Sequence, residues 1–151
     1  LDNADQNRRK VPGWRIRKDL AFIGWRYGSH PNIDYGFIPL TEAGNLSGLA
    51  ILRRNVRYGI NEVVISELLF EDSNNKSADR LLREIGKSVK ADYLITHFNK
   101  NTPELKALKR NFFIKAPGQD IIFLIKGLAE EKEKFNRQEH WNLSIVDIEL
   151  F

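Results

Sequence analysis

The stretch that decides the fold is INEVVISELLFEDSNNKSADRLLREIGKSV, residues 60–89. Its first part, residues 60–70, is apolar and rich in β-branched side chains, and predicts the longest strand of the chain. A polar loop follows. From residue 77 to residue 91 apolar side chains recur at helical spacing with charged ones on the other face, which predicts an amphipathic helix. The apolar stripe consists of Ala78, Leu81, Leu82, Ile85 and Val89.

Upstream of this stretch, the pattern predicts one helix and two strands. RKDLAFIGWRYGSHP, residues 17–31, places Leu20, Ile23 and Tyr27 on one helical face, with Asp19 in the first turn. IDYGFIPLTEAGNLSGLAILRR, residues 33–54, predicts two strands around a turn at residues 42–45. A second turn, NVRYG at residues 55–59, leads into the long strand.

Downstream, the expected elements are short. DYLITHF, residues 92–98, predicts a strand, and NTPELKALKRN, residues 101–111, predicts a helix with Thr102 as its N-cap. We then expect a hairpin over residues 112–128 with its turn at 117–120, a charged helix over 130–139 and a last strand over 140–151. This order predicts an α+β fold in which helices flank a mostly antiparallel mixed sheet.

Composition sets further limits. The chain has 151 residues, 42% hydrophobic and 29% charged, as in one soluble globular domain. It lacks a signal peptide pattern and any apolar run of about 20 residues, so we expect no membrane association and a cytoplasmic location. Without cysteine, and with three scattered histidines, no metal site is expected. Because methionine is also absent, we expect a piece of a longer protein, with a flexible segment 1–13 before a domain 14–151.

The net charge is +4, and basic residues gather in RRK at 8–10 and RRNVR at 53–57. Such clusters suit either phosphate binding or a solvated face, and the solvated face is the commoner case. Several aromatic residues near arginines suit either a stacking surface or the core, and nucleic-acid binding ranks last among the expected partners. These residues are Trp14, Arg15, Trp25, Arg26, Tyr27 and Tyr35.

The order of elements, and above all the step from INEVVISELLF through EDSNNKSADRLLREI, resembles the GNAT acyltransferase superfamily. KDLAFIGWRYGSHPNIDYGFI and HWNLSIVDIEL are similar to the opening and closing segments of a GNAT-like branch found in bacterial envelope and polysaccharide gene products. The resemblance implies transfer of an acetyl or other acyl group from acyl-coenzyme A to an amine or hydroxyl, on a sugar or cell-envelope precursor. It also implies a neighbouring domain in the full-length protein.

In that family a strand runs into a loop of pattern Q/R-x-x-G-x-G/A, and the next helix points its N-terminus at the cofactor pyrophosphate. By resemblance, main-chain amides of Leu68, Leu69 and Phe70 hold the pantetheine arm. The pyrophosphate would lie against Ser73, Asn74, Asn75, Lys76, Ser77 and Ala78. Ala78 fits the pattern, whereas Lys76 replaces a glycine and Ser73 a Gln or Arg. The loop therefore either binds acyl-coenzyme A or only begins a capped helix.

Acyl transfer needs a base and an acid. Strict alternation puts Glu67 on one face with Ile65 and Leu69, where an apolar setting raises a carboxyl pKa, so Glu67 is the first candidate base. The alternative is a carboxylate paired with a nearby Arg or Lys. Glu62 is a weaker candidate. His97, at the end of a short strand, is the second candidate, or else a structural histidine.

The family's usual acid is a tyrosine, whose place falls at Ala107 or Leu108, and neither side chain donates a proton. A second hypothesis therefore stands beside the enzyme. The chain is then a catalytically degenerate GNAT-like module that binds a partner domain or a glycan.

Overall fold

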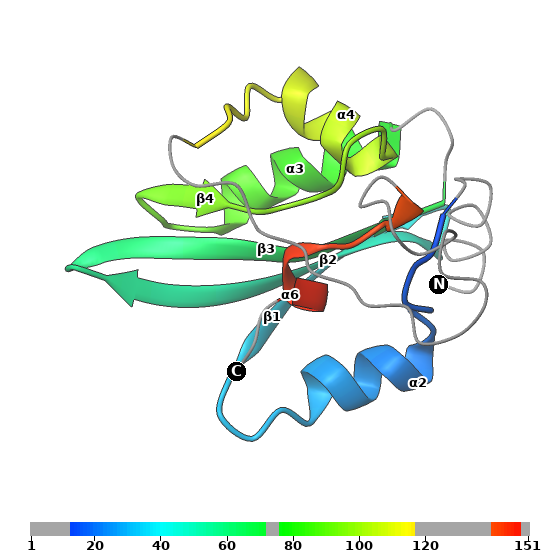
Figure 1. The fold of residues 1–151 in the computed structure, drawn as a ribbon, viewed down its shortest axis with the longest axis horizontal. Helices are drawn as coiled ribbons and strands as arrows, with labels where there is room; N and C mark the ends of the chain where they lie inside the picture. Colours follow the sequence, from blue (N-terminus) through cyan, green and yellow to red (C-terminus); the bar gives the residue numbers. More distant parts are fainter. Residues whose placement is uncertain (1–12, 72–75, 117–139, 149–151) are drawn as a thin grey trace, which may run out of the picture.

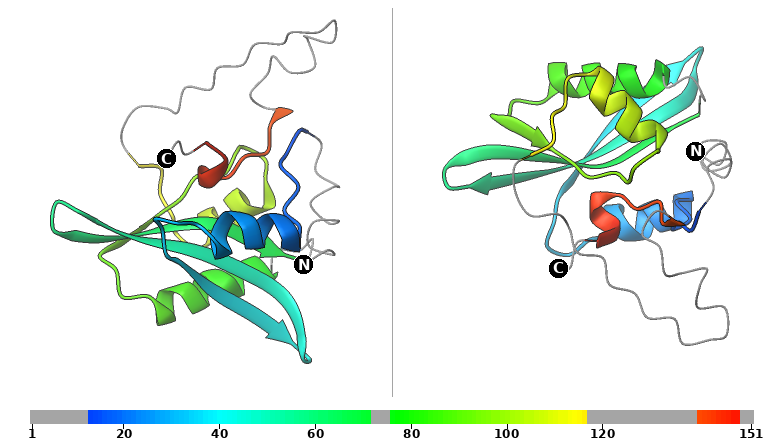
Figure 2. Two further views of the ribbon diagram at one scale, coloured as in Figure 1. Left: turned by 90° about the horizontal axis from the view of Figure 1, so that it is seen from below. Right: turned by 45° about the horizontal axis from the view of Figure 1, so that its top comes forward.

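The computed structural model describes residues 13–71, 76–116 and 140–148. Their fold is α+β, with a four-stranded mixed sheet between two layers of helices (Figure 1). The helices α3 (Lys76–Ser88) and α4 (Pro103–Arg110) cover one face. The other face carries α2 (Leu20–Ile23), its continuation η1 (Gly24–Gly28), and α6 (Ile145–Ile148) (Figure 2). The expected fold class is confirmed at this level.

The strands of the sheet lie in chain order. They are β1 (Tyr35–Glu42), β2 (Asn45–Arg57), β3 (Ile60–Phe70) and β4 (Tyr93–Ile95). The first three pair antiparallel, and β4 joins β3 in parallel. Two-residue turns with positive φ, Ala43–Gly44 and Tyr58–Gly59, connect the antiparallel strands, as right-handed strand twist favours. Both predicted turns are confirmed.

The predicted helices before and after the sheet core are confirmed, together with their start signals. The Asp19 carboxylate accepts a hydrogen bond from the Phe22 N–H (2.9 Å) at the start of α2. The Thr102 hydroxyl accepts one from the Leu105 N–H (3.3 Å) at the start of α4. Among the described helices, none is long and apolar enough to cross a bilayer.

A β-bulge at Ser66 divides the long strand. Ile51 of β2 pairs with Glu67 and Leu52 pairs with Ile65, so Ser66 is an extra residue in β3. Ile65 therefore faces α3 and α4, whereas Glu67 faces α2 and α6. The strict alternation that placed Ile65 and Glu67 on one face is wrong, because the bulge changes which residue numbers share a face.

Each face of the sheet buries its own apolar cluster. Beneath α2 and α6 the buried side chains are Ile23, Tyr27, Leu49, Ile51, Leu69 and Val146. Beneath α3 and α4 the larger cluster includes Ala50, Ile65, Leu68, Phe70, Ala78, Leu81, Leu82 and Ile85. The predicted stripe of α3 is thus confirmed, with Val89 partly buried just after the helix ends. Gly48 lets α3 lie close, because a Cβ there would be 3.0 Å from the Leu81 side chain.

Other expectations differ from the structure. Leu20 is 61% exposed rather than buried, and β4 has three residues instead of seven. Residues 112–116 form no strand, and the described part of the last predicted strand contains α6 and isolated bridges. The cause of α6 is a capping pair, in which the Ser144 N–H donates to the Asp147 carboxylate three residues later (2.8 Å). The turn at 117–120 and the helix over 130–139 lie outside the described residues.

Candidate functional site

Beyond Val64, β3 stays paired with β2 but no longer pairs with β4. The parallel β3–β4 pairing ends at Val64 and Ile95, and the Thr96 hydroxyl then donates to the Ile65 carbonyl (2.7 Å). At the far end of β3, the Glu71 N–H donates to the Ser47 carbonyl of β2 (3.2 Å). Main-chain groups alternate in direction along an antiparallel strand.

Two predicted cofactor-binding residues consequently face the side that β4 has left. By this alternation, the main-chain groups of Leu69 point toward β2, and those of Leu68 and Phe70 point the other way. All three side chains are buried, with Leu68 and Phe70 under α3 and Leu69 under α2. An extended ligand arm lying along the end of β3 would meet the main chain of Phe70.

The start of α3 lies at the carboxyl end of this strand. Of the predicted pyrophosphate residues, Lys76, Ser77 and Ala78 are described, and Ser73, Asn74 and Asn75 lie outside the described residues. Lys76 is exposed, whereas Ser77 and Ala78 are buried. Lys76 therefore offers a solvent-accessible cation beside the positive end of the helix dipole.

A carboxylate in the first turn of α3 is already neutralised. Arg110 holds both oxygens of Asp79 at 2.9–3.2 Å, and the Asn111 amide donates to one of them (2.9 Å). This contact joins the start of α3 to the end of α4. Because Asp79 is paired, its charge opposes an anion at the helix start less than a lone carboxylate would.

Glu67, the first candidate base, is completely buried in a polar cluster. Its Oε1 accepts hydrogen bonds from the Lys18 ammonium, from the Tyr27 hydroxyl (2.8 Å) and from the Ser144 hydroxyl (2.9 Å). Lys18 also donates to both oxygens of Asp147, at 2.7 and 2.9 Å. We call Lys18, Tyr27, Glu67, Ser144 and Asp147 the Glu67 cluster.

The cluster places one ammonium between two carboxylates away from water. The side chains of Lys18 and Asp147 are 4% and 2% exposed. Burial, and then the Glu67 carboxylate, raise the pKa of Tyr27 well above its ordinary range. Tyr27 therefore stays protonated and donates to Glu67.

These contacts favour the paired-carboxylate interpretation of Glu67. To accept a proton from a substrate, its Oε1 would have to give up hydrogen bonds to three buried donors. The apolar setting expected for Glu67 is replaced by a polar one, because the bulge turns it toward Lys18 and Tyr27.

Glu62 lies at the other end of β3. Burial pushes its pKa up, but hydrogen bonds from the Tyr93 hydroxyl (2.5 Å) and the Asn55 amide (3.1 Å), with nearby arginines, outweigh burial and hold the pKa below its usual value. Glu62 thus remains an ionised carboxylate on the sheet near the β2–β3 turn.

His97 is half-buried just after β4. Its Nε2 lies 3.3 Å from the Asn99 amide oxygen, and the Asn99 amide nitrogen donates to the Trp141 carbonyl. In the described part of the chain no hydrogen bond between His97 and Glu67 is present. They are connected indirectly, because Ser144 contacts Glu67 and forms a β-bridge with Phe98.

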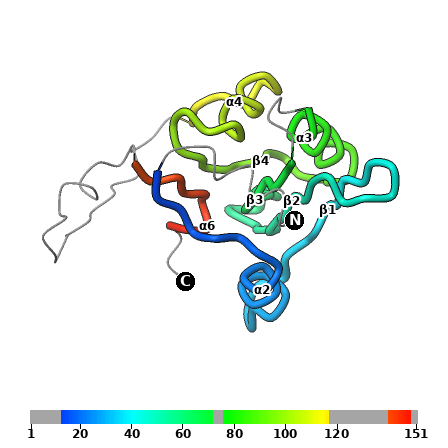
Figure 3. The backbone as a smooth tube through the Cα atoms, turned by 90° about the vertical axis from the view of Figure 1, so that its right-hand side faces the viewer, coloured from blue at the N-terminus to red at the C-terminus, as the bar shows by residue number. Residues whose placement is uncertain are grey.

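The segment that begins at residue 13 lies beside the segment 140–148, and together they carry three residues of the cluster, Lys18, Ser144 and Asp147 (Figure 3). The Trp14 N–H donates to the His140 carbonyl (2.5 Å), and the Asn142 N–H donates to the Trp14 carbonyl (2.7 Å). Gly13 has φ +125°, and a Cβ there would lie 2.6 Å from the His140 oxygen. This close approach requires glycine and aligns the segment carrying Lys18 with the segment carrying Ser144.

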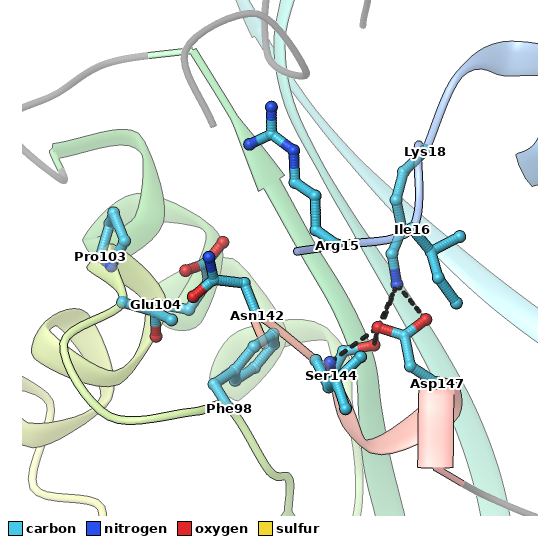
Figure 4. A pocket seen from close by; sticks show the side chains of 11 residues that line it. Arg15, Ile16, Lys18, Phe98, Pro103, Glu104, Asn142, Ser144 and Asp147 are labelled. Atoms are coloured by element: carbon cyan, nitrogen blue, oxygen red, sulfur yellow. Dashed lines mark hydrogen bonds and ion pairs between the residues drawn. The ribbon is translucent and has the colours of Figure 1, made fainter. Parts of the chain in front are cut away.

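A cavity of about 40 Å³ lies beside the cluster, between these two segments and the start of α4 (Figure 4). Its walls combine apolar, hydroxyl, amide and charged side chains. They are Arg15, Ile16, Lys18, Phe98, Thr102, Pro103, Glu104, Asn142, Leu143, Ser144 and Asp147.

A wider groove of about 830 Å³ runs along β1 and the end of α3. Its walls contain none of the predicted catalytic or cofactor-binding residues, but they include Tyr35 and Arg53 from the aromatic and basic sets named above.

The sequence patterns missed Lys18, Ser144, Asp147 and Glu104. Lys18 lies 49 positions from Glu67 and more than 120 from Ser144 and Asp147. Periodicity predicts only which residues of one helix or strand share a face, so it cannot predict contacts between distant segments. The one local signal was the pair Ser144 and Asp147, whose spacing is that of a capping box.

The carboxyl half of β3 thus leads toward α3, and its Glu67 contacts two residues that line the small cavity, Lys18 and Ser144. No group of three or more metal-ligating side chains occurs in residues 13–71, 76–116 and 140–148. Neither a model of a known protein family nor a curated protein sequence matches the chain.

Proposed function

We propose that the chain is a GNAT-like acyltransferase domain. It transfers an acetyl or other acyl group from acyl-coenzyme A to an amine or hydroxyl, on a sugar or cell-envelope precursor. The observation that carries this proposal is the end of the β3–β4 pairing at Val64, together with α3 as the next element after the carboxyl end of β3. In open sheets with parallel strands, ligands commonly bind outside the carboxyl ends of the strands.

The residues present fit the cofactor in two respects. The pantetheine arm carries amides, and these hydrogen-bond to the main chain of Phe70 at the end of β3. The pyrophosphate lies near Lys76 and the first turn of α3, where a helix dipole and an ammonium favour an anion. Acyl-coenzyme A supplies the activated thioester.

Of the two candidate bases, His97 is better placed than Glu67. Its ring is half-buried just after β4, and its Nε2 lies 3.3 Å from the Asn99 amide oxygen. Glu67 instead organises the cluster that joins both chain ends to β3. In this proposal the acceptor attacks the thioester directly, and His97 takes its proton.

A second candidate function is a GNAT-like module that binds without catalysis. Two observations favour it. Glu67 is held by Lys18, and the place of the family's usual acid is filled by Ala107 and Leu108, which are 0% and 3% exposed. In this case the module contacts a glycan or a neighbouring domain.

Nuclear magnetic resonance titration with acetyl-coenzyme A tests the proposal. We expect the amide signals of Leu68, Phe70 and Lys76 to shift, while those of Tyr58 at the distant β2–β3 turn stay in place. A transfer assay with amine acceptors then separates the two functions. Binding with transfer that His97→Gln reduces by about 10²–10⁴ supports the enzyme. Absence of shifts at millimolar ligand rejects the enzyme and leaves the module, which needs no cofactor.

A further inference from the structure

We propose that the outer edge of β2 between Arg54 and Arg57 binds an extended acidic segment of another protein, which joins the sheet as a further strand. The inference goes beyond both functions proposed above and does not depend on coenzyme A. It rests on the partial pairing of β2 with β1 and on the side chains of the part that β1 leaves uncovered.

The end of β2 extends past its outer neighbour. The pairing of β1 with β2 begins at Tyr35 and Arg53, whereas β2 continues to Arg57 and stays paired with β3. The hairpin of β2 and β3 extends beyond the start of β1 (Figure 1). In the described part of the chain, no strand pairs with residues 54–57 on the outer side. An uncovered edge of this kind is a template for an added strand.

Two residues of this edge direct their main-chain groups outward. The β2–β3 turn has two residues, so the flanking pair Arg57 and Ile60 bond each other. By alternation Asn55 also faces β3, whereas Arg54 and Val56 face the outer side. Each of these two offers one N–H and one carbonyl. Among the described residues, no main-chain hydrogen bond from a loop or turn reaches either of them.

The wide groove of about 830 Å³ provides space beside this edge. Its walls include Arg54 of β2, Asn32 and Gly36 from the segment that enters β1, and Val89 after α3. The volume lies within the range of about 300–1,000 Å³ in which proteins hold ligands. An added strand that runs antiparallel to β2 therefore has room for its side chains where β1 has not yet begun.

The charges beside the edge select an acidic segment. Arg54 and Arg57 are exposed, and Arg53 lines the groove. Asp34 also lines the groove, and Glu62 of β3 lies near Arg53 and Arg57. Three positive charges thus stand against two negative ones. Because Glu62 is only 4% exposed, the side chains that an added strand meets are mainly the arginines.

A second copy of the chain fits this edge less well. The antiparallel register that uses both outward residues pairs Arg54 with Val56 of the other copy. It also places Arg57 of one copy opposite Arg53 of the other, and like charges directly opposite destabilise a strand pair. The matching segment instead has acidic residues opposite Arg54 and Arg57, and an apolar residue opposite Val56, which is 68% exposed.

The peptide acetyl-Gly-Glu-Val-Thr-Glu-Gly-amide is the probe for this pattern, and the same peptide with both Glu replaced by Lys is the charge control. Short peptides bind weakly because they lose conformational freedom, so the nuclear magnetic resonance titration extends to about 5 mM. We expect the amide signals of Arg54, Val56 and Tyr58 to shift, and those of Leu82 in α3 to stay in place. The Lys peptide should bind at least about threefold more weakly, since two attractive pairs become repulsive. Absence of shifts, or equal affinity of the two peptides, would overturn the inference.

A methyl group on the peptide main chain separates strand addition from ion pairing alone. On the Val nitrogen it removes the N–H that would donate to the Val56 carbonyl, and it places bulk against the edge. On the Thr nitrogen it points away from β2. The first change should weaken binding about tenfold or more, and the second less than about threefold. Equal loss with both methylated peptides would refute an added strand.

Val56→Pro makes the same test on the protein. Proline is tolerated in an edge strand where the N–H faces away from the neighbouring strand, and here it removes an outward donor. Val56→Ala is the matched control, because it shortens the side chain and keeps the N–H. We expect peptide binding to be lost in Val56→Pro and largely retained in Val56→Ala. If Val56→Pro lowers thermal stability, the two methylated peptides decide the question with the unchanged protein.

Other occupants give different results. If the Arg54 and Val56 signals shift when the chain alone is concentrated, and the peptide has no effect, the edge binds a second copy and the inference is wrong. If vesicles of anionic lipid broaden these signals, and the peptide again has no effect, the hairpin binds a membrane and the inference is equally wrong. The acyltransferase proposal is tested separately, by the response of Phe70 and Lys76 to acetyl-coenzyme A.

Discussion

Replacement of Lys18 by methionine probes the Glu67 cluster most severely. The side chains have similar length, but methionine carries no charge and donates no hydrogen bond. Lys18 makes ion pairs with both Glu67 and Asp147, and all three side chains are almost completely buried. The variant therefore leaves two carboxylates close together, away from water and without their ammonium partner.

The expected loss of stability follows from this burial. Removing one partner of a buried ion pair costs about 3–5 kcal/mol. Domains of this size unfold with about 5–15 kcal/mol, so the variant loses a large share of its stability. At roughly 2–4 °C per kcal/mol, the midpoint of thermal unfolding falls by about 6–20 °C.

Urea titration followed by tryptophan fluorescence measures this loss, because Trp14 and Trp141 flank the segments that the cluster joins. Lys18→Arg keeps the charge and is the matched control, with a smaller expected loss. Glu67→Gln combined with Asp147→Asn in the Lys18→Met background should recover part of the stability, because the unpaired charges are then gone. A loss below about 1 kcal/mol for Lys18→Met would refute the buried ion cluster, since exposed pairs contribute that little.

Three further predictions concern other parts of the fold. Gly13→Ala should separate the segment around Trp14 from His140, because the added Cβ would lie 2.6 Å from the His140 carbonyl oxygen and Gly13 has φ +125°. Faster proteolytic cleavage near Trp14 would show this separation. Deletion of Ser66 should preserve cooperative unfolding, because this bulge residue has no pairing partner in β2. Deletion of Leu69 should abolish cooperative unfolding, because it moves Phe70 to the opposite face of the sheet and out of its core. Tyr93→Phe should make stability depend less on pH on the acid side. The folded pKa of Glu62 is held low, so its contribution is present above its unfolded pKa of about 4.3 and is lost as the pH falls through the lower folded value. The urea midpoints of both proteins, measured over a series of pH values, test this. If the midpoint of Tyr93→Phe falls at acid pH as steeply as that of the unchanged chain, the expectation is contradicted.

Local signals predicted most of the elements. The cap at Thr102, the turns before Asn45 and Ile60 and the stripe of α3 all depend on residues close in sequence, and each appears as expected. Asp19, expected in the first turn of its helix, is the N-cap one position earlier. The pattern failed where two local signals competed. Alternation in residues 140–151 predicted a strand, but the Ser144–Asp147 capping pair begins a helix there.

The site depended on contacts that no local pattern contains. The bulge at Ser66 adds one residue to β3 without any glycine or proline to mark it, and this changes the face on which Glu67 lies. Lys18 reaches Glu67 across 49 positions and Asp147 across 129, so only the folded chain brings their charges together. The succession of β3 and α3, by contrast, follows from local periodicity in residues 60–89.

Calorimetric titration of the chain with acetyl-coenzyme A tests the central claim most directly. If the carboxyl end of β3 and the start of α3 hold this cofactor, heat of binding appears with a dissociation constant below about 1 mM, and Lys76→Glu weakens it by placing a negative charge beside the pyrophosphate. Heat no greater than that of dilution at millimolar cofactor, or equal affinity in the Lys76→Glu variant, would contradict it.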